Sequence, residues 1–562
     1  MREANVTNRD SESLKWYSIN WRIVNATVNN LRQRIYRASV EGDIKKVRNL
    51  QKLLLHSKSN KLLAIRRVTQ QNQGRNTPGI DGIVIDTDAG REQLYQYLNK
   101  SITEKACPAK RVYIPKKNGE RRPLGLPVIV DRCRQAIVKS ALEPHWEEKF
   151  EASSYGFRPG RGAHDAIQKI YCIAPAGKKR QWVLDADIKG AFDNISHEFL
   201  IRAVGNFPAR ELIYQWLKAG VMENGHYQST EKGTPQGGVI SPLLANIAFH
   251  GMENVLEIKH TRLGCLKQAC PYALVRYADD FVVFGKTQES CEKAKTLLEP
   301  WLLERGLELS EKKTHIRHLK EGFDYLGFTV RHYPTRGKKR GYVLLIKPSK
   351  ESIKKYKQEM KKNWKESIGT STENMIRHLN SKITGWCNYF RTGVSKRVFS
   401  ALDHWMWGRQ ARYLYRRHPA KQWWWRIKSY FGKIRGRNDR WVFMDKTTNK
   451  ILLKHAWAEI KRHILIKGSA SPDNPELREY WQKRKAKKSQ FLYGIKPILE
   501  KRQRGICPIC GETFDNGELI QVHHVIPKAQ GGNNKLSNLR LLQFMILICY
   551  HFCKKPWILC KR

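Results

Sequence analysis

Two adjacent aspartates inside an apolar run constrain this chain more than any other feature. Tyr277-Ala278-Asp279-Asp280 lies within residues 273–284, where Leu, Val and Phe flank the acids on both sides. Such a run is typical of a β-hairpin with buried strands and a tight turn. Crowded carboxylates that lose solvent repel each other, so a cation should hold them, and a divalent metal is the natural candidate. A solvent-exposed turn also accommodates Asp-Asp, and for the pair alone both interpretations stay open.

The charge balance indicates a polyanionic partner. The 562 residues include 104 Lys and Arg against 51 Asp and Glu, which gives a formal net charge of +53 and a pI near 10.0. Nucleic acid phosphate is the usual partner of so large an excess. An aromatic content of 10%, with 17 Trp, argues against wholesale disorder, and the length allows three or more domains.

The chain ends and the cysteines favour a cytoplasmic protein, in a bacterial cytoplasm or an organelle matrix. Residues 1–20 are polar and lack the apolar core of a secretion signal. No apolar run approaches the ~18 residues of a membrane span, so no membrane partner is expected. Five of the 12 Cys follow residue 500 and the other seven are scattered, which fits one local metal site in a reducing compartment.

Periodicity predicts an α/β + α fold class in five parts. Residues 1–78 look helical and basic, and residues 79–335 alternate short β-like runs, such as Trp182–Ile188, with helical stretches. Residues 336–460 are helical again, with one apolar stripe through Ile353–Trp364 and another through Ile376–Phe390 after a Ser371 or Thr372 cap. Residues 461–500 are charged and predict a connector, and residues 501–562 form a small Cys/His module.

A third acid supports a catalytic interpretation of the hairpin. Residues 183–193 form a strand that ends in Asp187 and a following turn. Nucleotidyl transfer with two metals needs carboxylates on neighbouring strands, holding ions ~3.5–4 Å apart. Asp187 beside Asp279 and Asp280 would supply that arrangement, while Asp185 and Asp193 are rival acids.

A glycine-rich loop lies between these acids in the sequence. Residues 233–242 read Gly-Thr-Pro-Gln-Gly-Gly-Val-Ile-Ser-Pro, and Gln236 and Gly237 stand at the centre. Its glycines allow the backbone to approach a base pair or a phosphate, and Ser-Pro can begin a helix at Leu243. Alone this would be an ordinary loop, but between Asp187 and Asp279 it is predicted to face the substrate.

These residues resemble reverse transcriptases, and specifically the proteins encoded by mobile group II introns. The resemblance covers essentially the whole chain and rests on the order of the motifs: 111–116, 121–125, 155–159, 183–193, 234–242, 277–280, 307–314 and 323–328. It implies a right-hand polymerase, with fingers and a ferredoxin-like palm sheet in residues 79–335. The thumb and maturase domain would occupy 336–460, a basic DNA-binding linker 461–500, and an HNH-like ββα-metal module 501–562.

The resemblance also implies roles for individual residues. Two Mg²⁺ ions would be held by Asp187, Asp279 and Asp280, and the incoming nucleotide would contact a wider set: Lys116, Arg122, Phe192, Gln236, Gly237, Tyr277 and Lys312. Lys116 and Arg122 would clamp the triphosphate as point charge and fork. Phe192 lies five positions after Asp187, where an aromatic ring can exclude a 2′-hydroxyl, which predicts the use of dNTPs. A core phenylalanine is the alternative.

The Cys/His module resembles an HNH endonuclease with an atypical end. Cys507 and Cys510 form half of a zinc knuckle, and His523-His524 follows, with Asn538 beyond it. The resemblance implies His524 as general base, His523 as a ligand of the nuclease metal and Asn538 as an orienting residue.

The atypical end departs from the family pattern. Gln543 stands where the family has His. Cys549 and Cys553 can complete a Cys₄ Zn²⁺ site, with His551 a poor substitute ligand, or the apolar tail is a degraded terminus.

The predicted protein is multifunctional. It would copy intron RNA into DNA as an RNA-directed DNA polymerase during retrohoming, bind and stabilise the intron RNA for splicing, and nick target DNA if the module is active. The expected partners are structured intron RNA in a ribonucleoprotein, target DNA, dNTPs and a second copy of the chain. The alternatives are an RNA-binding splicing factor with an inactive nuclease, or a reverse transcriptase of another lineage.

Overall fold

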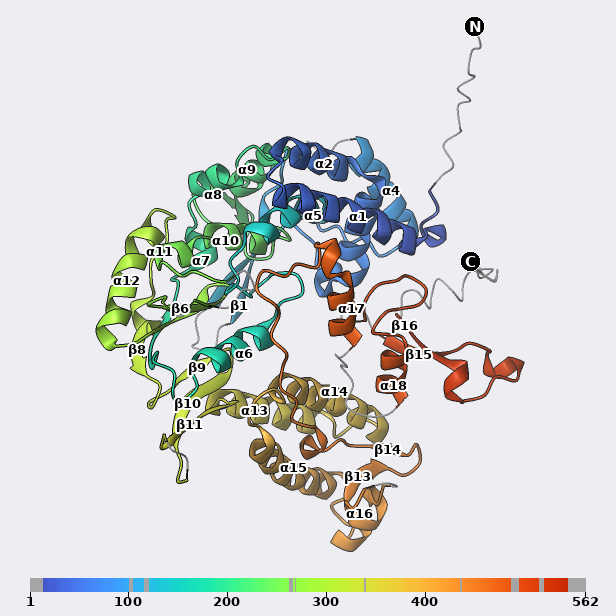
Figure 1. Cartoon of the computed structure of the whole chain (residues 1–562). Helices are drawn as coiled ribbons and strands as arrows, with labels where there is room; N and C mark the ends of the chain where they lie inside the picture. The colour runs from blue at the N-terminus through green and yellow to red at the C-terminus, as the bar shows by residue number, and fades with distance from the viewer. Residues whose placement is uncertain are drawn as a thin grey trace.

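The computed structural model describes residues 14–100, 105–115, 121–261, 266–267, 269–337, 340–434, 437–486, 495–514 and 520–543. In Figure 1 the first helices lie at the top, the central sheet at the left and the helices after Pro348 at the bottom. The last elements lie at the right, between the first helices and the bottom group. In the described part of the chain, no helix has the length and apolarity needed to cross a membrane.

The first part of the chain is a helical layer. Its helices are α1 (Trp21–Val40), α2 (Ile44–His56), α3 (Lys58–Arg66), α4 (Asp88–Lys100) and α5 (Ile129–Lys149). Asn20 and Asp43 cap α1 and α2 by accepting hydrogen bonds from backbone N–H groups of the first turn. The apolar face of these helices is buried, since Leu31, Ile35 and Leu54 all lie in the core.

A small four-stranded sheet follows and is called the fingers sheet here, because it carries the motifs predicted to form the fingers. Its order is β2 (Arg121–Leu126), β1 (Ala109–Pro115), β4 (Val221–Glu223) and β5 (His226–Gln228). β1 and β2 form the expected antiparallel hairpin, and β4 pairs with β1 in parallel at Ala109 and Val221.

The central sheet carries the three predicted acids. Its antiparallel order is β6 (Ala273–Tyr277), β7 (Asp280–Gly285), β3 (Trp182–Asp187) and β8 (His315–His318). Successive residues of a strand face opposite sides, so the sheet separates two cores. Leu184 and Phe281 pack on the side of α12 (Gln288–Leu303), and Val183 and Val275 pack on the side of α6 (Ala163–Ile173).

Short helices connect the central strands. They are α7 (Ala191–Asn194), α8 (His197–Val204), α9 (Arg210–Lys218), α10 (Ser241–Ala248) and α11 (Met252–Val255). Helix α10 begins at Ser241, two residues before the predicted start, because Pro242 occupies its first turn, where no N–H partner is required.

A second small sheet and a helical group follow the central sheet. The strands are β9 (Phe323–Tyr325), β10 (Phe328–Pro334) and β11 (Tyr342–Pro348). The helices are α13 (Lys350–Glu366), α14 (Thr372–Phe390), α15 (Lys396–Arg417) and α16 (Trp423–Tyr430), with strands β12 (Phe431–Gly432), β13 (Val442–Asp445) and β14 (Lys450–Ile451). Both predicted stripes are largely buried, and Ser371 caps α14.

Residues 461–486 differ from the expected connector because they pack closely on the body of the protein. Asp165 on α6 accepts hydrogen bonds from His463 Nε2 (2.9 Å) and Arg484 Nη2 (2.6 Å). Arg32 on α1 binds Asp473 at 2.7 Å, and Trp481 on α17 (Arg478–Ala486) is buried. The segment therefore ties the helical layer to the central domain.

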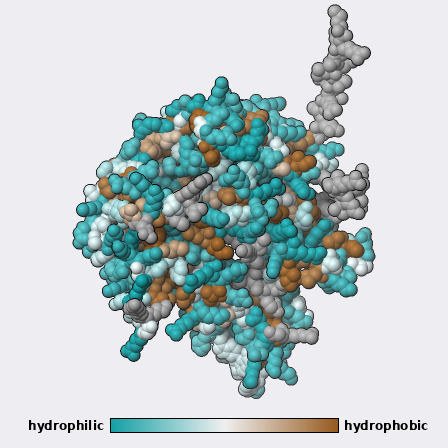
Figure 2. Space-filling view, in the orientation of Figure 1, coloured by the Kyte–Doolittle hydropathy of each residue, from teal (hydrophilic) through white to brown (hydrophobic). Residues whose placement is uncertain are grey.

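The last described elements are α18 (Ile495–Arg502) and the antiparallel hairpin of β15 (Ile520–His524) and β16 (Leu539–Gln543). Leu499, Cys507 and Leu541 belong to the same buried cluster as the helices α1 to α3. These buried apolar residues dock the module against the helical layer. The face of the molecule seen in Figure 2 is mostly hydrophilic, with hydrophobic residues in small separate groups.

Candidate active site

The strand register brings the three predicted acids to one edge of the central sheet. Asp187, the last residue of β3, pairs with Asp280, the first residue of β7. Tyr277 pairs with Asp280 across the hairpin, so Ala278 and Asp279 form its two-residue turn. This pairing brings the side chains of Asp187 and Asp280 to the same end of the two strands. Asp279 lies beside them in the turn.

Burial and crowding raise the pKa of two of these acids, Asp279 and Asp280. Burial, followed by repulsion from Asp279 and Asp187, raises the pKa of Asp280 to about 8. Burial also raises the pKa of Asp279, while the positive charges of Arg122 and Lys313 oppose that shift. A divalent cation bound by these carboxylates would offset the repulsion between their negative charges. The residues therefore fit a metal by their chemistry.

The side chains do not converge as finished metal sites. Among the residues that the structure describes, no group of three or more His, Cys, Asp or Glu is arranged to hold an ion. Instead Lys313 Nζ lies 2.6 Å from Asp187 Oδ2, and this ion pair raises the pKa of Lys313. Lys312, the predicted substrate contact, lies one residue earlier on the same 3₁₀ turn. Lys313 is thus a site residue that the sequence motif did not single out.

The rival acids have different surroundings. Asp185 lies within β3, opposite Val282 of β7, and burial raises its pKa to about 7. Asp193 lies on the short helix α7, where Gln236 Nε2 donates to its Oδ2 at 3.4 Å. Asp185 therefore lies behind Asp187 in the sheet, and Asp193 interacts with the glycine-rich loop.

A buried arginine and a glycine hold the acidic hairpin in place. Arg276, fully buried, donates to Ser154 Oγ (2.7 Å), Asn246 Oδ1 (3.1 Å) and the carbonyl oxygen of Ala278 (3.2 Å). Ala278 has a positive φ of 58°, a conformation that a non-glycine residue adopts at a cost. A Cβ on Gly156 would lie 2.3 Å from the backbone nitrogen of Ala278. The segment around Gly156 is therefore a tight support for the turn.

The glycine-rich loop is fastened to the fingers sheet. Gln236 accepts a hydrogen bond at its backbone oxygen from the Gly125 N–H (2.8 Å). Gly237 has a φ of 129°, and a Cβ there would lie 2.6 Å from the Gly125 oxygen. Phe192 on α7 is half-buried and meets Phe157 edge to face, with ring centroids 6.1 Å apart. The loop is thus held against β2 at Gly125, and Phe192 is held by Phe157.

Of the two residues predicted to contact the triphosphate, the structure describes only Arg122. Arg122 is exposed on β2, and its positive charge opposes the rise in the pKa of Asp279. Lys116 lies outside the described residues. Tyr277 is half-buried at the end of β6, and burial raises the pKa of its hydroxyl.

In the terminal module, the two histidines face opposite sides of β15. His523 is buried, whereas His524 is half-buried and its Nε2 lies 2.9 Å from Asn534 Oδ1. Asn538 is buried and holds the loop between the strands, because it accepts from the Ile526 N–H (2.7 Å) and donates to the Ile526 oxygen (3.0 Å). The predicted roles of these three residues stay predictions.

The two cysteines of the predicted zinc knuckle, Cys507 and Cys510, lie next to Gln543. Cys507 and Cys510 are buried side by side, and the Cys510 thiol lowers the pKa of Cys507. Cys510 Sγ lies 2.8 Å from Gln543 Oε1, and Gln543 is fully buried. Two thiols fit half of a Zn²⁺ site, but the carboxamide at their side is a weak ligand. Cys549, Cys553 and His551 lie outside the described residues.

Comparisons with known families decide the assignment. Residues 114–330 match the family described as reverse transcriptase (RNA-dependent DNA polymerase), and residues 16–98 match the N-terminal domain of reverse transcriptase. Residues 353–432 match the maturase-specific domain of group II introns, and residues 507–543 match HNH endonuclease.

Curated relatives agree with these matches. The chain is 33% identical to protein YkfC of Escherichia coli K12 over 303 residues, 46% of this chain and 77% of that protein. It is 28% identical to the group II intron-encoded protein LtrA of Lactococcus lactis over 557 residues, 84% of this chain and 87% of LtrA. The chain belongs to the group II intron-encoded proteins.

As a group II intron-encoded protein, the chain is a multifunctional enzyme. It combines an RNA-directed DNA polymerase with a maturase domain and an HNH domain, and the family prediction made from the motifs is confirmed. Families of this kind use divalent metals and bind intron RNA and nucleotides. A telomerase from Candida albicans, solved in complex with a TWJ fragment of telomeric RNA, aligns with a TM-score of 0.34 and 13% identity. The alignment covers 58% of this chain and 61% of that one.

Proposed function

We propose that this protein copies intron RNA into DNA during intron homing and stabilises the same RNA for splicing. The observation that supports the polymerase role most directly is the register of β3 and β7, which sets Asp187 opposite Asp280 with Asp279 in the adjoining turn. Carboxylates on neighbouring strands are what two-metal nucleotidyl transfer requires. We infer that the chain is a right-hand polymerase with a helical thumb after the palm.

In this proposal Asp187, Asp279 and Asp280 hold two Mg²⁺ ions. The ions, when bound, would activate the primer 3′-hydroxyl and neutralise charge on the triphosphate. The chain's own contribution is positioning. Arg122 supplies a forked positive charge that acts on Asp279, and Lys116 adds a second charge to the clamp.

Other residues shape the nucleotide site in the same proposal. Gln236 and Gly237 bring backbone close to the new base pair, and Phe192 blocks a 2′-hydroxyl so that dNTPs are used. Tyr277 and Lys312 contact the substrate from the palm. The half-buried position of Phe192 against Phe157 supports this role, because a ring held on one face presents a fixed wall.

We infer five functional parts with the bounds predicted from the sequence. Residues 1–78 are a basic helical extension, 79–335 fingers and palm, and 336–460 thumb and maturase domain. Residues 461–500 are a basic DNA-binding segment, and 501–562 are the HNH-like ββα module. The close packing of 461–486 on α6 supports a fixed rather than a loose course for the fourth part.

The terminal module is proposed to nick target DNA, with His524 as general base and His523 as a ligand of the nuclease metal. Cys507 and Cys510 would hold Zn²⁺ together with Cys549 and Cys553. Nicked DNA would then provide a primer for copying the intron, in a ribonucleoprotein that includes a second copy of the chain. A reducing bacterial cytoplasm or organelle matrix is the proposed compartment.

Primer extension on an RNA template tests the polymerase proposal. Asp279→Asn is expected to reduce cDNA synthesis by at least about 100-fold, because the variant loses a charge that the metals need. Asp86→Asn is a matched control, since Asp86 is exposed far along the chain from the palm strands. Equal activity of Asp279→Asn and wild type would remove the catalytic assignment. A wild type that binds RNA but makes no cDNA would favour the second candidate, an RNA-binding splicing factor.

A further inference from the structure

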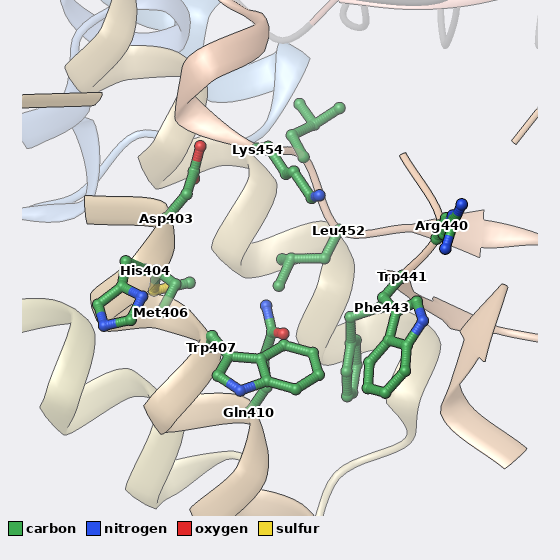
Figure 3. A pocket seen from close by; sticks show the side chains of 11 residues that line it. Asp403, His404, Met406, Trp407, Gln410, Arg440, Trp441, Phe443, Leu452 and Lys454 are labelled. Carbon is green, nitrogen blue, oxygen red and sulfur yellow. The ribbon is translucent and has the colours of Figure 1, made fainter. Parts of the chain in front are cut away.

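A cavity of about 430 Å³ lies in the maturase region, away from the acids of the palm. It opens between α15 and the strands β13 and β14, and its lining includes Trp407, Gln410, Arg440, Trp441, Phe443 and Lys454. Figure 3 shows the Gln410 amide near the ring of Trp407, with Phe443 and Trp441 to one side and Lys454 on the opposite side of the cavity from Trp407. Cavities of this size accommodate small planar ligands.

The aromatic wall of the cavity is rigid on one side and open on the other. The rings of Trp407 and Trp441 have centroids 5.4 Å apart, and Trp407 also packs on Phe431 at 5.1 Å. Trp441 nevertheless remains 39% exposed. An indole that is fixed by its neighbours and open to solvent on one face is a ready stacking platform, because it loses little freedom when a ligand arrives.

Some polar side chains of the cavity have hydrogen-bond partners within the protein, and one does not. Both oxygens of Asp403 accept hydrogen bonds from the backbone of residues 455–456, and Lys454 Nζ binds Asp439 Oδ1 at 2.6 Å. The side chain of Gln410 makes no hydrogen bond within the described part of the chain. Its amide offers both a donor and an acceptor, so it can pair with the edge of a base that stacks on the indole.

We propose that this cavity captures one unstacked nucleobase of a bound RNA strand. The base stacks on Trp441, Gln410 hydrogen bonds to its edge, and exposed Arg440 at the rim contacts the adjacent phosphate. Charge complementarity favours RNA over a protein ligand, since Lys and Arg far outnumber Asp and Glu between residues 350 and 460. This assignment rests on the proposed function, in which the maturase region binds RNA.

Photo-crosslinking tests the assignment. The probe is a 12-nucleotide oligouridine RNA with one central 4-thiouridine, irradiated with the full-length protein and mapped by peptide mass spectrometry. Wild type should crosslink within the peptides that carry Trp407 or Trp441. Trp441→Ala should lower that yield about tenfold through loss of stacking, and Gln410→Ala should lower it a few-fold. Crosslinks confined to other regions, or an undiminished yield from Trp441→Ala, would overturn the proposal.

Two controls separate the possible failures. Trp424→Ala removes an indole that is 70% exposed on the nearby helix α16 but does not line the cavity, so its yield should match wild type. Gln410→Ala guards against misfolding, because it removes a side chain that has no hydrogen-bonded partner among the described residues. Each variant should retain primer extension. Salt-sensitive RNA binding with crosslinks elsewhere would refute only the base pocket, whereas absent RNA binding by wild type would refute the proposed function itself.

Discussion

Lys313, rather than the predicted Lys312, forms an ion pair with an acid of the candidate active site. Its Nζ holds Asp187 Oδ2 at 2.6 Å, while Lys312 has no such contact with the acids. Lys313→Ala should therefore slow single-nucleotide incorporation about tenfold, since a freed carboxylate loses its orientation. Lys312→Ala is the matched control and should have a smaller effect. Rapid-quench primer extension measures both rates, and a larger loss in Lys312→Ala would restore the lysine chosen from the motif.

The choice between neighbouring residues shows where sequence reasoning stops. The motif identified Asp187, Asp279 and Asp280, and the strand register brings all three to one edge of the sheet. Which of two adjacent lysines reaches Asp187 depends on the rotation of a single 3₁₀ turn, which no periodicity encodes. The buried pairing of Cys510 with Gln543 could not be foreseen either, because it depends on the fold of the hairpin.

Among the elements, the acidic hairpin depends most on its support. Gly156→Ala would place a Cβ 2.3 Å from the Ala278 nitrogen, and backbone cannot move aside cheaply. We expect a loss of about 1–3 kcal/mol in the free energy of unfolding and a fall in cDNA synthesis. Gly369→Ala, where the new Cβ would meet nothing within 4 Å, should change the unfolding free energy by less than about 0.5 kcal/mol. Urea unfolding compares the two, and equal stabilities would contradict the tight support.

Helix α5 carries a histidine that should make folding depend on pH. Burial, with a smaller effect of Lys149, lowers the pKa of His145 to about 4, and its Nδ1 lies 2.9 Å from Ser39 Oγ. The unfolded chain then binds a proton from about pH 6.5 downwards while the folded chain does not. The free energy of unfolding therefore carries no penalty from His145 above about pH 6.5, and it decreases as the pH falls from 6.5 towards 4.

A variant isolates this pH effect. His145→Gln keeps a hydrogen-bonding group but cannot titrate, so the slope of unfolding free energy against pH should decrease by up to ~1.4 kcal/mol per unit between pH 4 and 6.5. His404→Gln, at an exposed position, is the control. Urea midpoints across this range measure the slope. An unchanged slope in His145→Gln would show that this histidine is not held neutral.

Helices and strands agree closely with the prediction where the periodicity of their own segment indicates them. The run predicted at Trp182–Ile188 is a strand over Trp182–Asp187, and the stripe through Ile376–Phe390 is the buried face of α14. Periodicity reports such elements because each residue's burial repeats within the segment. The course of residues 461–486 was missed because its partners are remote, as with Asp165 and His463, which are 298 residues apart.

At the scale of the whole molecule, that segment links three parts of the protein. It follows the maturase region, binds α6 through Asp165, and reaches α1 through the pair of Asp473 and Arg32. The terminal module then packs on the same helical layer, where Glu512 accepts hydrogen bonds from Asn25 and Gln71. Intron-binding and polymerase regions are therefore held in fixed relation, so an RNA that spans both can bind without first ordering them.

The charge of the whole molecule should dominate that binding. A formal excess of +53 implies many displaced counterions, so affinity for a structured RNA should fall at least about 100-fold between 50 and 200 mM salt. Filter binding at several salt concentrations gives the slope of log affinity against log salt. Replacing exposed Lys354, Lys355 and Lys361 of α13 with Gln should reduce that slope by roughly 0.7 for each lysine that contacts a phosphate. Salt-independent affinity would show that stacking and shape, rather than charge, govern the complex.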